Sequence, residues 1–68
     1  MEVIFYNPGK SILKRGRDIE VLPRTDEHIT FDGVHEYMVK MIIHDYQNQQ
    51  IHVWLMNVTS NRVAWLFN

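Results

Sequence analysis

The chain has 68 residues, of which 46% are hydrophobic and 22% are charged, with a net charge of −1 and no cysteine. This composition is typical of one ordered domain over residues 1–68, and it excludes disulfides and cysteine-based zinc sites. A domain of this size buries only about 60% of the surface that its unfolded chain exposes, so its core is marginal and a second subunit is a common remedy.

Targeting signals are absent from the sequence pattern. No secretory leader is visible, and no apolar run approaches the roughly 20 residues of a membrane span. We therefore expect a complete short cytoplasmic protein that does not act at a membrane.

Turn residues divide the N-terminal half into short strands. Residues 7–10 (Asn-Pro-Gly-Lys) have Pro and Gly at the central positions of a type II turn, between predicted strands at 3–6 and 11–13. Residues 18–22 alternate between polar and apolar side chains and stop at Pro23, which cannot donate to a strand ladder. Gly16 and Pro23 are the expected corners of a curled sheet.

The dipeptide Asp32-Gly33 lies between apolar segments at 29–31 and 34–37. Asp-Gly between two such segments predicts a β-hairpin with a two-residue loop. Closely spaced strands of this kind are typical of a small β-sandwich or barrel.

Residues 34–46 fit two structures. A helix aligns Val34, Tyr37 and Met41 but places Asp45 inside the apolar stripe. A strand places an unbroken apolar set on one face, and we therefore favour a strand. The members of that set are Tyr37, Val39, Met41 and Ile43.

A three-residue loop at 47–49 would pair this strand with the segment that follows, placing His44 opposite His52 and Ile43 opposite Val53. One face of this hairpin is purely aliphatic, and the other mixes aromatic, long and amphipathic side chains. The aliphatic face consists of Val39, Met41, Ile43, Ile51, Val53 and Leu55. The mixed face consists of Met38, Lys40, Ile42, His44, Tyr46, Gln50, His52, Trp54 and Met56.

A last predicted strand at 62–67 is apolar on both sides. The predicted fold is therefore all-β: a five- or six-stranded antiparallel meander or barrel of SH3-like or OB-like type. The alternative is an α+β fold in which a helix at about 34–46 lies on a sheet.

The sequence contains no constellation typical of catalysis. It has no glycine-rich phosphate loop and no serine in the context of a nucleophile. His44 and His52 are candidate cross-strand neighbours, but a zinc site usually needs a third ligand. We predict no enzymatic activity, no metal and no cofactor.

Protein binding is the function that the sequence favours. Apolar residues between 51 and 67 occupy both faces of the predicted strands, so one face needs a cover. Aromatic residues and methionine are enriched in interface cores. We predict a protein-binding regulator or inhibitor, as phages often encode, with a homodimer or another protein as partner. The predicted contact residues are Tyr46, His52, Trp54, Met56 and Trp65.

Nucleic-acid binding is the alternative function. Residues 10–17 form a local basic segment, and Tyr46 or Trp54 could stack on bases. The whole domain is slightly acidic, whereas nucleic-acid binders generally carry a basic stripe. The candidate contact residues for RNA or single-stranded DNA are Lys10, Lys14, Arg15 and Arg17.

Overall fold

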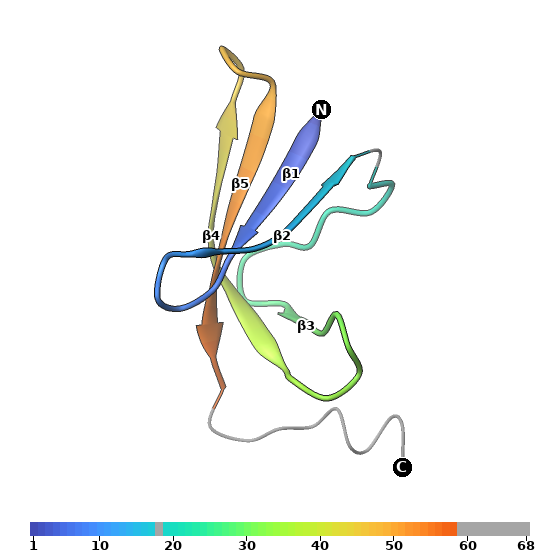
Figure 1. Cartoon of the computed structure of the whole chain (residues 1–68), viewed down its shortest axis with the longest axis vertical. Helices are drawn as coiled ribbons and strands as arrows, with labels where there is room; N and C mark the ends of the chain where they lie inside the picture. Colours follow the sequence, from blue (N-terminus) through green and yellow to red (C-terminus); the bar gives the residue numbers. More distant parts are fainter. Residues whose placement is uncertain (18, 59–68) are drawn as a thin grey trace.

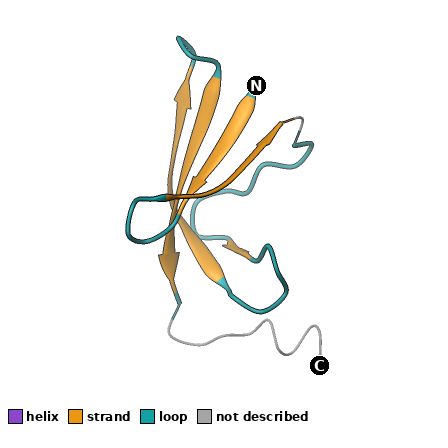
Figure 2. Ribbon diagram, in the orientation of Figure 1, coloured by secondary structure: helices purple, strands orange, loops and turns teal. Residues whose placement is uncertain are grey.

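The computed structural model describes residues 1–17 and 19–58, and these residues form five strands and no helix (Figure 2). One sheet holds all five in the order β2-β1-β5-β4-β3 (Figure 1). The all-β prediction is confirmed, and residues 34–46 contain a strand instead of the alternative helix. The strands are β1 (Glu2–Tyr6), β2 (Ile12–Arg17), β3 (His28–Ile29), β4 (Tyr37–Asp45) and β5 (Gln50–Asn57).

The sheet curls into a half-barrel whose edges are β2 and β3 (Figure 1). β1 pairs with β5 in parallel, with Val3 opposite Ile51, while the other three pairings are antiparallel. This parallel pair departs from the predicted antiparallel meander. The burial of β1 explains its central place, because Val3, Ile4 and Phe5 are all buried and both faces of the strand need neighbours.

The hydrophobic core lies on the inner, concave face of the half-barrel. Phe5 contacts Phe31 edge to face at 4.9 Å between ring centroids, so the connection between β2 and β4 closes this side of the sheet. The core residues are Val3, Phe5, Val39, Val53 and Leu55, with Leu22, Ile29, Tyr37, Ile42 and Ile51 packed against them.

The β4–β5 loop has four residues, 46–49, so the predicted three-residue loop is wrong. Asp45 fixes this turn, because its carboxylate accepts hydrogen bonds from the backbone N–H and the side-chain amide of Asn48, at 3.1 and 2.8 Å. Gln49 takes the left-handed conformation, with φ at 54°. As a result His44 pairs with Ile51, and Ile43 pairs with His52.

A β-bulge between Val39 and Met41 reverses the alternation of side chains along β4. Val39 and Ile42 face the core, whereas Met41 and Ile43 lie on the opposite face and are 44% and 47% exposed. The predicted aliphatic face is therefore correct for Val39 but wrong for Met41 and Ile43.

The first turn lies where it was predicted, but it is not of type II. Lys10, and not Gly9, takes the left-handed conformation, with φ at 68°. Its backbone N–H donates to the carbonyl of Asn7 at 2.8 Å, and the N–H of Ser11 donates to the Asn7 side chain at 3.1 Å. The position of the turn was therefore predictable, and its type was not.

Of two further local predictions, one is wrong and the other is wrong only in its loop length. Residues 19–22 do not form a strand; instead Ile19 packs close to Gly16, where an added Cβ would lie 3.1 Å from its Cδ1. The hairpin predicted around Asp32-Gly33 is present, since β3 and β4 pair antiparallel on either side of it, but its loop spans residues 30–36 instead of two residues. Asp32 accepts the N–H groups of Val34 and His35, both at 2.8 Å, and so removes donors that a tight hairpin would use in its ladder. The predicted strand at 62–67 lies outside the described residues.

Candidate protein-binding face

The convex side of the sheet, here called the outer face, is a candidate functional surface. Strand register places one side chain from each of β2, β1, β5 and β4 in successive rows across it. One row consists of Ile12, Tyr6, Trp54 and Met41, and the next consists of Arg15, Ile4, His52 and Ile43. The outermost row on the hairpin side consists of Arg17, Glu2, Gln50 and Asp45, and Met38 and Met56 form a fourth at the opposite end.

An aromatic stack occupies the centre of this face. The rings of Tyr6 and Trp54 are nearly parallel, 9° apart, with centroids separated by 4.9 Å. His52 lies 5.7 Å from each of the two rings. The parallel pairing of β1 with β5 creates the stack, because it sets Tyr6 directly opposite Trp54.

A hydrogen bond to one ring nitrogen and a longer ionic contact to the other orient His52 in this stack. The Tyr6 hydroxyl lies 2.7 Å from His52 Nδ1, and Asp45 Oδ2 lies 3.7 Å from His52 Nε2. A proton on Nε2 is favoured by the carboxylate, and it leaves Nδ1 free to accept the tyrosine hydroxyl. The stack is therefore a preorganised unit and not a set of independent side chains.

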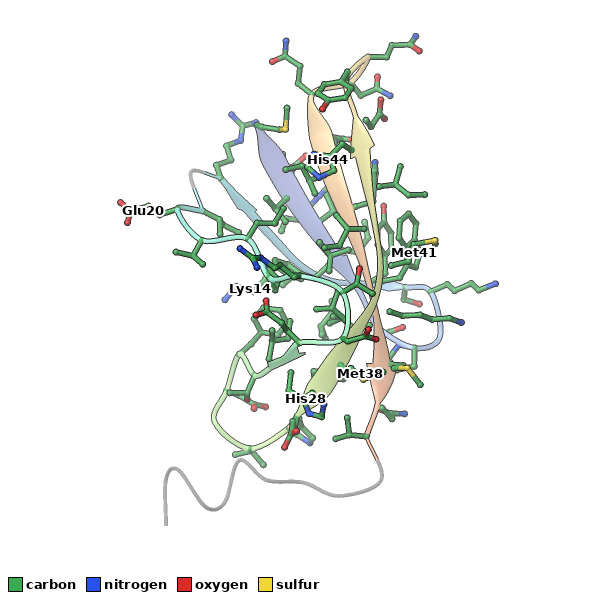
Figure 3. All side chains as sticks on the ribbon, turned by 180° about the vertical axis from the view of Figure 1, so that it is seen from behind. Lys14, Glu20, His28, Met38, Met41 and His44 are labelled. Carbon is green, nitrogen blue, oxygen red and sulfur yellow. The ribbon has the colours of Figure 1, made fainter. Side chains whose placement is uncertain are left out.

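Exposed apolar side chains surround the stack. Ile12, Met41, Ile43 and Met56 are between 38% and 50% exposed. In Figure 3 the Met41 side chain projects from the strands on the side away from Lys14. An apolar surface spread over four adjacent strands marks an interaction site more often than a solvated face.

Charged groups border the outer face unevenly. Arg15 and Arg17 lie on the β2 side, where Arg15 Nε is 3.2 Å from Glu2 Oε2. Asp45 lies on the β4 side, and hydrogen bonds from Asn48, with a smaller contribution from His52, lower the pKa of its carboxyl. The face is therefore more positive at one side and negative at the other.

The structure brings together some of the predicted contact residues and separates others. His52, Trp54 and Met56 lie on the outer face. Tyr46 sits at the tip of the β4–β5 hairpin, 79% exposed, with its ring 6.2 Å from that of His44. Trp65 lies outside the described residues.

Four members of the outer face were not predicted from the sequence: Tyr6, Ile12, Met41 and Ile43. Tyr6 was missed because the parallel pairing of β1 with β5 joins segments far apart in the chain. Met41 and Ile43 were assigned to the core because strict alternation does not reveal a bulge. The amphipathic end of the apolar segment 3–6 was the one signal for Tyr6 in the sequence.

The four predicted nucleic-acid-binding residues do not share a surface. Lys10 lies in the first turn, and Arg15 and Arg17 lie on the outer face. Lys14 pairs with Phe5 and faces inward, with its ammonium 5.3 Å from the centre of the Phe31 ring. The basic segment therefore divides between the two sides of the sheet.

The histidines do not form the cross-strand pair considered as a metal site. His44 lies opposite Ile51, and His52 lies opposite Ile43. Within residues 1–17 and 19–58, no three His, Cys, Asp or Glu side chains are grouped so that they could hold a metal ion.

In the described part of the chain, no helix has the length and apolar character required to cross a membrane. Comparisons with protein-family models, with curated proteins and with solved structures find no match for this chain.

Proposed function

We propose that this protein is a small non-catalytic regulator that binds protein through its outer face, with a second copy of the chain as its first partner. The observation that carries the proposal is the Tyr6–Trp54 stack at the centre of an exposed apolar surface. Rigid aromatic groups ringed by apolar contacts are typical of interface hot spots.

The border charges favour a second copy as the partner. The positive side of the face carries Arg17 beside the Arg15–Glu2 ion pair, and the negative side carries Asp45 in the same row as Arg17. A two-fold axis parallel to the strands would set the positive side of each copy over the negative side of the other. The apolar rows around Trp54 would then form the centre of the contact. Burial of this surface would also offset the small size of the core.

Sedimentation equilibrium of two variants tests this proposal. We expect Trp54→Ala and Met41→Lys each to weaken self-association by about tenfold or more, because both remove apolar contact at the centre of the face. Tyr46→Ala is the matched control, since Tyr46 is exposed at the hairpin tip and apart from the stack.

Circular dichroism and thermal melting separate lost binding from lost folding. Met41 is 44% exposed, so Met41→Lys should keep the fold even if Trp54→Ala does not. Unchanged association in a folded Met41→Lys variant would contradict the proposal.

Nucleic-acid binding is less well supported by the same geometry. Arg15 is engaged by Glu2, and Lys14 faces the other side of the sheet. A titration with single-stranded RNA and DNA at two salt concentrations discriminates the two functions. Tight binding that falls steeply as salt rises would favour the nucleic-acid function.

A further inference from the structure

A pocket of about 560 Å³ lies on the inner side of the half-barrel, between β2 and β3. Its apolar lining comes from the core residue Phe5, the connection residues Ile19 and Val21, and the β3 region with Ile29 and Phe31. This volume lies within the range of about 300–1,000 Å³ that is usual for small-molecule sites. The pocket is separate from the outer face, since it is lined by the opposite side of the sheet.

Lys14 supplies a positive charge to this pocket. Its position opposite Phe5 in the β1–β2 ladder turns the side chain inward, and the ammonium lies 5.3 Å from the centre of the Phe31 ring. Among the ion pairs formed by residues 1–17 and 19–58, none includes Lys14. The ammonium therefore borders a largely apolar space without an ion pair to a carboxylate of the described residues.

The two other ionisable groups in the lining, Glu27 and His28, have hydrogen-bond partners within the chain. Glu27 accepts the backbone N–H of Arg24 at 2.6 Å, and His28 is hydrogen-bonded to the buried Glu36. Lys14 is thus the group in this lining best placed to recognise charge on a ligand.

We propose that this pocket binds a small anion with an aromatic or branched-aliphatic body and a carboxylate that pairs with Lys14. The apolar walls would take the body, and the ammonium over Phe31 would take the charge. Ile19, Val21 and Pro23 form a wall of the pocket, and this wall occupies the space that an added peptide strand would need. The expected ligand is therefore a compact molecule.

Calorimetric titration with two probes of the same body tests the proposal. Naphthylacetate carries the carboxylate, and naphthylacetamide is its neutral counterpart. We expect the full-length protein to bind the acetate about three- to fivefold more tightly, the usual scale for a partly exposed ion pair. Lys14→Met should remove this preference and leave amide binding unchanged, whereas Lys10→Met, a charge loss in the first turn, should keep it.

A second variant adds charge at the same site without touching the core. Val21 is 81% exposed and lines the pocket, so Val21→Glu should weaken the acetate and spare the amide. NMR shift changes should fall at Gly16, Ile29 and Phe31 and not at the Trp54 indole. Equal binding of the two probes, no binding, or shifts centred on Trp54 would each overturn the pocket proposal. None of these results bears on self-association through the outer face.

Discussion

Two aspartates organise loops that join strands of the sheet. The Asp32 carboxylate accepts hydrogen bonds from the His35 side chain, at 2.7 Å, and from the backbone N–H groups of Val34 and His35. These hydrogen bonds hold the pKa of Asp32 far below its usual range. Asn48 lowers the pKa of Asp45 in the same way, by its side-chain and backbone donors. Each carboxylate therefore supports its loop only while it is ionised.

This arrangement predicts a loss of stability in acid. A carboxyl whose pKa is lower in the folded state stabilises the fold above its unfolded pKa of about 3.9, and the contribution is lost as pH falls through the folded pKa. Urea unfolding should be measured at about pH 7 and about pH 3. The free energy of unfolding should fall more in acid for the wild-type protein than for Asp32→Asn, whose side-chain oxygen can still accept the backbone N–H groups but cannot ionise. An equal acid loss in the two proteins would contradict the role assigned to Asp32.

At the scale of elements, local patterns predicted where turns lie better than they predicted turn types or register. The strand over Tyr37–Asp45 was predictable because its apolar side chains alternate. The bulge in β4 was not, because it is fixed by distant groups. The Asp26 N–H donates to the Val39 carbonyl at 2.8 Å, and the Val39 N–H donates to the Glu27 carbonyl at 2.9 Å. A sequence window around Val39 contains none of these partners.

The first turn offers a stability test at this scale. Lys10 holds a φ of 68°, which costs a residue with a Cβ roughly 1–2 kcal/mol relative to glycine. Lys10→Gly should therefore raise the free energy of unfolding, by up to about 1 kcal/mol once the greater freedom of the unfolded glycine is subtracted. Denaturant melts measure the change.

Ser11→Gly is the matched control for this substitution. Ser11 is the next residue along and does not have a positive φ. Glycine at this position should lower stability, because it adds only freedom to the unfolded chain. A stability loss in Lys10→Gly as large as that in Ser11→Gly would contradict the strain assigned to Lys10.

At the scale of the whole molecule, the half-barrel has a closed core on one side and an apolar face on the other. The sequence predicted this division, since apolar residues in the segment 51–56 alternate onto both faces. It also predicted Trp54 and His52 as surface residues of interest. Tyr6 escaped prediction because nothing local pairs the first strand with the fifth, and only the folded sheet brings their rings together.

Light scattering of the wild-type protein in solution, at low and at high salt, tests the central claim about the outer face most directly. We predict a dimer of twice the 8.2 kDa chain mass at both salt concentrations, since the apolar centre of the contact is little affected by screening. High salt should weaken association only modestly, through the border charges. A mass of 8.2 kDa at every protein concentration and both salt concentrations would contradict the claim that this face closes on a second copy.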